Sequence, residues 1–283
     1  MRPPSGESYK RIKGLSENLA LHTVCEEAHC PNIGECWSGG TATFMLLGDV
    51  CTRGCRFCAV KSGNPNKIVD ELEPLKIAYA LKEMRLNYIV LTSVDRDDLP
   101  DGGAEHFAKT IIETRKTCPD MLIEVLTPDF KGDLLAIRKI VEARPDVFAH
   151  NIETVKRLQT RARDRRANYD QSLEVLRQVK KMDSSIYTKS SIMLGLGERD
   201  EEVIESIRDL RAIDVDILAI GQYLRPSNWH LEVEEYVPPS KFEEFKTIGE
   251  NLGFKFVASG PLVRTSYRAG EFFVENLIPQ KRS

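Results

Sequence analysis

The chain has 283 residues, of which 41% are hydrophobic and 29% are charged, and its formal net charge is −3. This composition is typical of a soluble globular enzyme built on one large α/β domain, and the small net charge excludes a global attraction to nucleic acid or to an anionic membrane. No apolar run reaches the roughly 18 residues that a membrane helix needs. The opening MRPPSGESYKRIKG lacks the apolar centre of a secretory signal, so we expect a cytoplasmic protein.

Apolar runs and helical spacing alternate along most of the chain. Residues 1–42 are polar, and we expect them to be irregular around a cysteine-rich centre. Patterns typical of buried strands cover residues 43–50, 88–94, 121–127, 146–153, 186–194, 215–223 and 254–259. Patterns typical of helices cover residues 74–86, 103–117, 133–143, 170–182, 200–213 and 240–253, the last of which ends at Gly253.

This alternation predicts parallel β/α units. An open doubly wound sheet and a full or partial β/α barrel are both consistent with it. No strand is followed by the pattern G-x-G-x-x-G, which weakens the dinucleotide-binding version of the open sheet. Polar or reactive residues follow several strands, as at the active end of β/α barrels: Cys51, Ser93, Asp129, Asn151 and Glu153. We expect one core domain with terminal extensions.

Cysteines concentrate in one short part of the chain. Seven are present, at positions 25, 30, 36, 51, 55, 58 and 118. The odd number and the lack of a signal argue against a disulfide framework and favour metal binding. Cys118, which precedes Pro119, is expected to be a lone thiol without a role in a cluster.

The segment CTRGCRFC places Cys51, Cys55 and Cys58 in a C-x3-C-x2-C array. Unrelated structural cysteines would make this spacing a coincidence, and a zinc site would need a distant fourth ligand. A four-iron cluster takes one thiolate per iron, so three cysteines leave one iron open to a small molecule. Gly54 allows the loop to wrap closely, and Phe57 is placed to shield one side of a cluster from water.

The segment CEEAHCPNIGEC adds Cys25, Cys30 and Cys36 in a C-x4-C-x5-C array, again without a fourth thiol. His29 adjoins Cys30, and adjacent side chains rarely enter one tetrahedron. Pro31 and Gly34 indicate a wrapping loop rather than a helix. A zinc knuckle is the alternative to an iron–sulfur cluster at this array.

The first array, with an aromatic residue before its last cysteine and a strand directly before it, resembles the signature of the radical S-adenosylmethionine (SAM) superfamily. The resemblance implies a partial (β/α)6-type TIM barrel over residues 43–260, with an amino-terminal extension over 1–42 and a carboxy-terminal one over 261–283. It also implies that SAM chelates the open iron of a 4Fe-4S cluster. Reductive cleavage of SAM then gives a 5′-deoxyadenosyl radical, which abstracts hydrogen from an unactivated carbon.

Within that superfamily, the second array upstream of the first resembles lipoyl synthase, and so do segments throughout residues 5–272: PSGESYKRIKGL, TSVDRDDLPDGGAEHF, TPDF, HNIETV, KSSIMLGLGE, GQYLRPSNWHL and SGPLVRTSYRAGEFF. The family's R-S-S-Y motif reads here Arg264-Thr265-Ser266-Tyr267, with threonine in place of its first serine. The resemblance implies that Cys25, Cys30, Cys36 and Ser266 hold an auxiliary 4Fe-4S cluster, the sulfur donor. A serine oxygen is a weak ligand for iron and can leave.

The resemblance further implies insertion of two sulfur atoms at carbons 6 and 8 of an octanoyl chain, with two SAM molecules cleaved per product. The chain is bound to a lysine of a lipoyl carrier domain, such as the glycine cleavage H protein or the E2 subunit of a 2-oxoacid dehydrogenase. A ferredoxin or flavodoxin would supply electrons, and the enzyme would be a monomer. The competing interpretations are a sulfur-inserting enzyme similar to biotin synthase, which the second array disfavours, and a non-catalytic zinc or electron-transfer protein.

Further candidates rest on the same resemblance. Asn151, Glu153, Lys189 and Ser190 are candidate SAM contacts, with helix capping as the alternative for the first two. Gly195 and Gly197 would permit close approach to the cofactor or form a turn, and Arg264 is expected near the auxiliary cluster. The acidic run 95–103 is expected to be a solvated loop. The basic run 157–166 is expected to be either a solvated helical face or a docking surface for acidic carrier domains.

Overall fold

The computed structural model describes residues 7–27, 30, 32–38, 41–84, 86 and 88–266. Its strands are β1 (His22–Thr23), β2 (Thr41–Leu46), β3 (Val50–Cys51), β4 (Lys61–Ser62), β5 (Tyr88–Ser93), β6 (Leu122–Leu126), β7 (Val147–Ala149), β8 (Tyr187–Leu194), β9 (Ile217–Gln222) and β10 (Phe256–Gly260). Its α-helices are α1 (Glu7–Asn18), α2 (Val24–Glu27), α3 (Ile33–Ser38), α4 (Glu73–Met84), α5 (Ala104–Thr117), α6 (Leu134–Glu142), α7 (Gln159–Ala162), α8 (Tyr169–Met182), α9 (Asp200–Ala212) and α10 (Pro239–Asn251).

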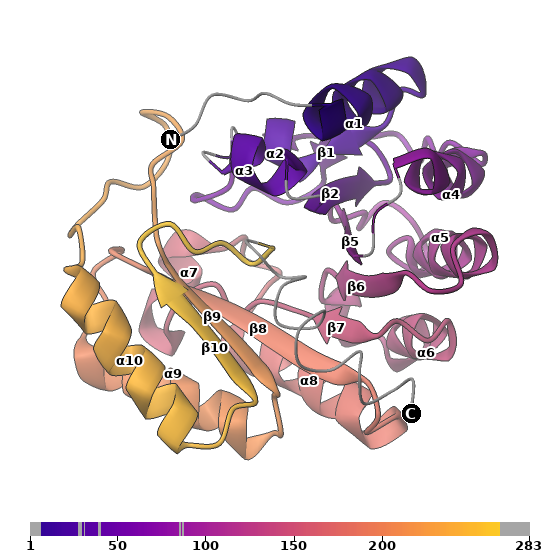
Figure 1. Ribbon diagram of the computed structural model, residues 1–283. Coiled ribbons are helices and arrows are strands. Elements are labelled where there is room, and N and C mark those ends of the chain that lie inside the picture. Colours follow the sequence, from indigo (N-terminus) through magenta and orange to yellow (C-terminus); the bar gives the residue numbers. More distant parts are fainter. Residues whose placement is uncertain are drawn as a thin grey trace.

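The main sheet follows the chain in simple succession, in the order β2-β5-β6-β7-β8-β9-β10 with all neighbours parallel. Strand β1 adds an antiparallel edge beside β2. Helices α4, α5, α6, α8, α9 and α10 connect successive strands and cover the outside of the curved sheet (Figure 1). A doubly wound sheet reverses its strand order at a switch point, and this sheet has no reversal. In the part of the chain that the structure describes, β1 and β10 do not pair, so the fold is the expected partial barrel.

The strand expected over residues 146–153 is shorter than predicted, because β7 ends at Ala149. Regular pairing stops there: His150 N still donates to the Lys189 carbonyl at 3.0 Å, and Glu153 keeps only an isolated bridge to Ile192, with a left-handed backbone of φ 67°. Left-handed backbone is uncommon outside glycine and interrupts a strand. His150, Asn151 and Glu153 line the carboxyl end of the barrel, while Ile152 is buried in the core.

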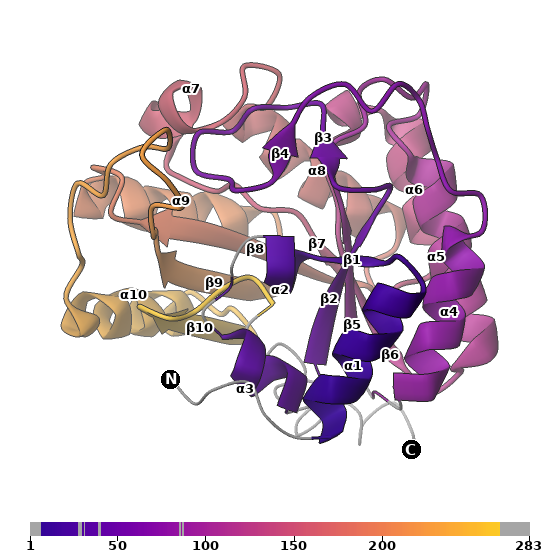
Figure 2. The same cartoon turned by 90° about the horizontal axis from the view of Figure 1, so that it is seen from above.

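The amino-terminal extension is not irregular, and that expectation is wrong. It forms α1, β1, α2 and α3, which pack over the edge of the barrel near β2 and α4 (Figure 2). Ile12 and Trp37 are fully buried, and the ring of Tyr9 lies 5.1 Å from that of Trp37. Helix α1 is polar in composition, so tertiary packing of a few apolar residues stabilises it rather than intrinsic propensity.

The cysteine loop that follows β2 lies at the carboxyl end of the parallel strands. It is bounded by the short parallel pair β3 and β4, in which Cys51 lies opposite Ser62, and it sits beside α7 (Figure 2). Near the amino ends of the strands, the interior of the barrel is filled and closed by a buried cluster of Tyr88, Glu124 and Lys189. There, Lys189 Nζ donates to both carboxylate oxygens of Glu124, at 2.8 and 2.9 Å, and the Tyr88 hydroxyl donates to the same carboxylate.

Candidate functional site

The first cysteine array lines a cavity of about 270 Å³ at the carboxyl end of the strands. Cys51, Cys55 and Cys58 all contribute to its wall. Two backbone amides point at their sulfur atoms: Arg53 N lies 3.4 Å from Cys51 Sγ and Asp164 N lies 3.3 Å from Cys55 Sγ. Burial raises the pKa of each of the three thiols to about 12. Stable thiolates at this place therefore need a positive charge beside them, which bound iron provides.

Polar side chains from the end of β7 form the opposite part of that cavity. Asn151 Nδ2 donates to Glu153 Oε1 at 3.2 Å and to Thr265 Oγ1 at 3.1 Å, and its Oδ1 accepts from no backbone amide of the described residues, so Asn151 does not cap a helix. Asn151 Oδ1 is buried and has no hydrogen-bond partner among the described residues. Burial raises the pKa of Glu153, and the positive charge of Arg163 partly offsets this rise. An unpaired acceptor and a guanidinium beside three thiols suit a zwitterionic ligand.

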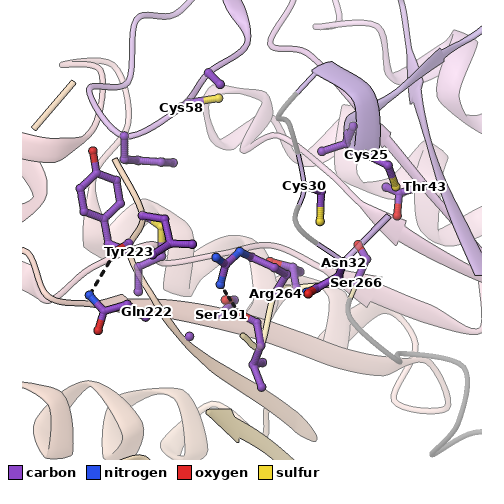
Figure 3. A pocket seen from close by; sticks show the side chains of 18 of the residues that line it. Cys25, Cys30, Asn32, Thr43, Cys58, Ser191, Gln222, Tyr223, Arg264 and Ser266 are labelled. Atoms are coloured by element: carbon purple, nitrogen blue, oxygen red, sulfur yellow. Dashed lines mark hydrogen bonds between the residues drawn. The ribbon is translucent and has the colours of Figure 1, made fainter. Parts of the chain in front are cut away.

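The second cysteine array lines a neighbouring cavity of about 440 Å³. Cys25, Cys30, Cys36 and Ser266 all belong to its wall, together with Arg264. Figure 3 shows Cys25, Cys30, Arg264 and Ser266 around this space. Segments from early and late in the chain meet here, where Asn32 Nδ2 donates to the Leu262 carbonyl at 2.8 Å. Burial raises the pKa of the Cys25 thiol to about 11, and the nearby Cys30 adds to the rise. His29, Pro31 and Tyr267 lie outside the described residues.

The local structure of the second array differs from the expected loop. Gly34 and Cys36 lie on helix α3 rather than on a wrapping loop, and that prediction is wrong. The helix is short, and the burial of Trp37 next to Cys36 anchors it. On the other side, a Cβ at Gly221 would lie 2.2 Å from the Val263 carbonyl oxygen. Glycine at this position allows the segment that carries Ser266 to cross β9 closely.

The two cavities share part of their lining, namely Val24, Phe57, Cys58, Leu126 and Glu153. The two cysteine arrays therefore face adjacent spaces with a common wall. Phe57 lies in this wall, beside the last cysteine of the first array. A substrate that reaches into the larger cavity can lie between the two arrays.

The spacing of these thiols does not create a site for a single metal ion. No group of three His, Cys, Asp or Glu side chains that could hold one ion occurs within the described residues. One zinc ion, with Zn–S distances of about 2.3 Å, needs its ligands around a single point. A four-iron cluster binds each thiolate through a different iron, so its ligands are more widely spaced. Two arrays of thiols that do not converge on one point are thus compatible with two iron–sulfur clusters.

Two expected SAM contacts do not reach either cavity. Lys189 lies at the closed end of the barrel, in its ion pair with Glu124. Ser190 Oγ accepts a hydrogen bond from Ile152 N at 3.2 Å, so Ser190 holds the segment that carries Asn151 and Glu153. The residues of β8 that do line the larger cavity are Ser191 and Met193. Side chains alternate along a strand, and the motif alone did not show which of them face the cavity.

The structure also places residues that the motifs did not single out. Arg163 lines the smaller cavity, and its Nη1 donates to Ser172 Oγ at 2.8 Å. Ser172 Oγ in turn lies 3.0 Å from His150 Nε2, and His150 Nδ1 lies 2.9 Å from the Thr127 carbonyl. Burial and the charge of Arg163 lower the pKa of His150 to about 4, so this histidine is neutral at pH 7. The sequence placed His150 inside the expected strand 146–153, and only the early end of β7 at Ala149 puts it after a strand.

The two charged runs are largely paired within the chain. The acidic run is not a solvated loop: Arg96 is 1% exposed and binds Asp98, while Asp97 binds Arg53. In the basic run, ion pairs join Arg157 to Glu202, Arg161 to Glu234 and Arg166 to Asp164, and Arg163 is buried. This pairing weakens the docking-surface interpretation.

Gly195, Gly253 and Cys118 were also singled out in the sequence, and the structure places each of them. A Cβ at Gly195, which has φ 100°, would lie 2.2 Å from Gln222 Nε2, so this glycine serves a tight turn. Gly253, with φ 92°, ends α10 as predicted. Cys118 is the residue that ends α5 and belongs to the wall of neither described cavity. Within the described residues, no helix is both long and apolar enough to cross a membrane.

Comparison with solved structures confirms the fold. A methylornithine synthase superposes with a TM-score of 0.54 over 88% of this chain and 84% of its own, at 16% identity. The FeFe-hydrogenase maturase HydG from Carboxydothermus hydrogenoformans superposes with a TM-score of 0.61 over 83% of this chain and 65% of its own, at 13% identity. At these identities the likeness concerns the fold alone.

Comparison of sequences reaches further. The model of the radical SAM superfamily matches residues 45–210. The mitochondrial lipoyl synthase of Homo sapiens is 55% identical over 99% of this chain and 77% of its own length. The chloroplastic lipoyl synthase of Ricinus communis is 57% identical over 100% of this chain and 79% of its own length. The lipoyl synthase of Myxococcus xanthus (strain DK1622) is 55% identical over 100% of this chain and 94% of its own length. The chain therefore belongs to the lipoyl synthase family of the radical SAM superfamily.

Proposed function

We propose that this protein inserts two sulfur atoms, at carbons 6 and 8, into an octanoyl chain that is amide-linked to a lysine of a lipoyl carrier domain. The proposal rests on one observation: the cavities of the two cysteine arrays share a wall. The chain that shows this arrangement is a member of the lipoyl synthase family. An enzyme that activates a carbon at one array and delivers sulfur from the other needs both arrays within reach of one substrate chain.

In this proposal Cys51, Cys55 and Cys58 hold the 4Fe-4S cluster that binds SAM. Asn151 and Glu153 offer acceptors for the amino and hydroxyl groups of SAM, and Arg163 offers a guanidinium to its carboxylate. Ser190 orients the segment that carries Asn151 and Glu153. When bound, this cluster and SAM supply a carbon-centred radical, and the auxiliary cluster supplies sulfur. Phe57 shields the wall between the two from water.

Cys25, Cys30, Cys36 and Ser266 are the proposed ligands of the auxiliary cluster. Oxygen binds iron less well than thiolate in such sites, so the Ser266 bond is the easiest of the four to break when sulfur is removed. Arg264 lies in the same wall and interacts electrostatically with Cys30, which favours a negatively charged cluster.

The larger cavity is the proposed site of the octanoyl chain. Its volume of about 440 Å³ lies within the range of small-molecule sites, which is roughly 300–1,000 Å³. Met193, Tyr223 and Val263 give it apolar wall for a hydrocarbon chain. The glycine cleavage H protein and the E2 subunits of 2-oxoacid dehydrogenases are the proposed carriers. A ferredoxin or flavodoxin is the proposed electron donor. The proposed form of the enzyme is a cytoplasmic monomer.

The deciding experiment combines metal analysis with a substrate assay. After anaerobic reconstitution, two four-iron clusters require about eight iron atoms per chain. With SAM, a reductant and an octanoyl-lysine peptide, the peptide should gain the mass of two sulfur atoms as the dithiol, and lose two hydrogens only when this is oxidised to the disulfide. SAM cleavage without sulfur in the peptide would contradict the proposed substrate or sulfur donor. Zinc in place of iron, without SAM cleavage, would contradict the proposed function as a whole.

A further inference from the structure

Arg53 lies between Cys51 and Cys55 in the sequence, yet its side chain is only 3% exposed. Its guanidinium binds the carboxylates of Asp97 and Asp129 in fork geometry, and its Nε also lies 3.2 Å from Asp95 Oδ1. Nη1 and Nη2 donate to the two oxygens of Asp129 at 2.8 and 2.7 Å, and Nε and Nη2 donate to the two oxygens of Asp97 at 2.9 and 3.1 Å. Only arginine presents donors in this planar arrangement, since the lysine ammonium is a point charge.

The two carboxylates come from fixed parts of the barrel. Asp97 follows β5 and Asp129 follows β6, and the side chain of Asp129 also accepts from Lys131 N at 2.9 Å. The neighbouring Thr52 strengthens the connection: its Oγ1 donates to the Asp95 carbonyl at 2.9 Å and accepts from Asp97 N at 3.0 Å. The cysteine loop is thus bound to the ends of two adjacent strands.

A third attachment lies on the other side of the loop. Gly54 N donates to Asp164 Oδ2 at 3.0 Å, while Asp164 N donates to Cys55 Sγ at 3.3 Å. Arg53 is buried among these contacts and binds the loops after β5 and β6 with two hydrogen bonds each. The more exposed Arg166 side chain joins Asp164 to Asp97 and to the Thr52 carbonyl. A loop that is ordered in advance loses less conformational entropy when its ligand binds.

We propose that Arg53, Asp97 and Asp129 form a positioning clamp that fixes the three-thiol loop before a cluster is loaded, and that lysine cannot replace Arg53. The inference rests on the proposed role of Cys51, Cys55 and Cys58 as cluster ligands. Arg53 and Asp129 belong to the wall of the smaller cavity, but in this proposal their charged groups bind each other rather than SAM or substrate. It determines how quickly and how completely the site takes up iron and sulfide.

The test measures cluster loading in full-length protein that carries Cys25→Ala, Cys30→Ala and Cys36→Ala, so that one site remains. Arg53→Lys is compared with Arg115→Lys, a matched change at the other end of the strands, where Arg115 binds Asp146 at 2.7 Å and the Met121 carbonyl at 2.6 Å. We expect Arg53→Lys to slow iron–sulfide incorporation by roughly 10–100-fold, the range for groups that orient metal ligands. Arg115→Lys should load at the rate of the parent.

A second readout separates positioning from general support of the fold. Hydrogen exchange of the cluster-free chains should rise in residues 52–58 of Arg53→Lys and stay unchanged in β6 and α5. Asp129→Asn removes one charge and leaves the pair between Arg53 and Asp97, so its slowing should be smaller than that of Arg53→Lys. This milder variant keeps the test informative if Arg53→Lys folds poorly.

Three results would overturn the clamp. The first is loading of Arg53→Lys at the rate of Arg115→Lys, with unchanged exchange in the loop. The second is a rise of exchange throughout the barrel in both Arg53→Lys and Asp129→Asn, which would make Arg53 a support of the whole fold. The third is a parent protein that takes up no iron, which would refute the cluster assignment itself and the clamp with it.

Discussion

At the scale of single residues, the chemistry depends on a few side chains whose surroundings differ strongly. The three cysteines of the first array are half-buried, and the sulfur atoms of Cys51 and Cys55 accept from backbone amides, whereas Ser266 brings an oxygen to the cavity wall that holds the second array of thiols. This difference makes Ser266 the residue whose substitution best separates the two arrays.

Ser266→Ala should leave SAM cleavage at about the wild-type rate and abolish the sulfur-containing product, because only the auxiliary cluster loses a ligand. Thr265→Ser is the matched control, since it keeps the hydroxyl that accepts from Asn151. Product mass and 5′-deoxyadenosine are measured in the same reaction. Normal amounts of sulfur-containing product from Ser266→Ala would contradict the ligand assignment.

His150 predicts a pH dependence. Its pKa is about 4 in the folded chain and about 6.5 in the unfolded chain, so the unfolded chain binds the proton first as the pH falls from 6.5 to 4. This group therefore destabilises the fold over that range, by about 2 kcal/mol at pH 5 relative to pH 7. Asp95 acts in the opposite direction, because burial raises its pKa to about 6 and protonation then favours the folded state.

The comparison with His150→Gln isolates the histidine, since Asp95 is common to both proteins. Urea unfolding of the cluster-free proteins at pH 7 and pH 5 gives the two free energies of unfolding. The wild type should lose about 2 kcal/mol more than His150→Gln between these pH values. Equal losses in the two proteins would show that His150 is not held neutral.

At the scale of elements, the position of the carboxy-terminal segment depends on contacts with strands and with the amino-terminal extension. Val263 crosses β9 at Gly221, and Leu262 accepts from Asn32. Neither contact is visible as a local pattern, because the partners are far apart in the sequence.

Gly221→Ala should displace the segment that carries Ser266, because the added Cβ would lie 2.2 Å from a backbone carbonyl. We expect loss of the auxiliary cluster, measured as about half of the iron per chain, with SAM cleavage retained. Gly14→Ala is the control: its Cβ would meet nothing within 4 Å, and alanine favours a helix. Full iron content in Gly221→Ala would show that the segment does not depend on this approach.

At the scale of the whole molecule, the open barrel separates a site at the carboxyl ends of the strands from a buried ion pair at the closed end. Lys189 is 5% exposed and Glu124 is 0% exposed. Such a pair is a poor candidate for ligand binding, because each charge already has its partner and little solvent reaches it. Its removal should act on stability instead.

Lys189→Met should lower the free energy of unfolding by roughly 3–5 kcal/mol, since it leaves Glu124 buried without a counter-charge. Lys116→Met, which removes an exposed pair with Glu113, should cost less than about 1 kcal/mol. Urea unfolding of the cluster-free proteins measures both. A variant with unchanged stability and weakened SAM binding would restore Lys189 as a cofactor contact.

The sequence alone determined the β/α order and both cysteine arrays, because hydrophobic periodicity and ligand spacing are local properties of the chain. It also placed Asn151 and Glu153 after a strand, where they reach the cavity. It missed α1, whose stability comes from the burial of Ile12 and Trp37 against distant residues.

Only the tertiary structure decided which side chains meet. It placed Ser191 rather than Ser190 at the larger cavity, because that depends on which face of β8 is turned inward. It brought Ser266 to Cys25, Cys30 and Cys36, and Arg53 to Asp97 and Asp129. These contacts arise from packing between elements far apart in the sequence, and no local pattern of residues encodes such packing.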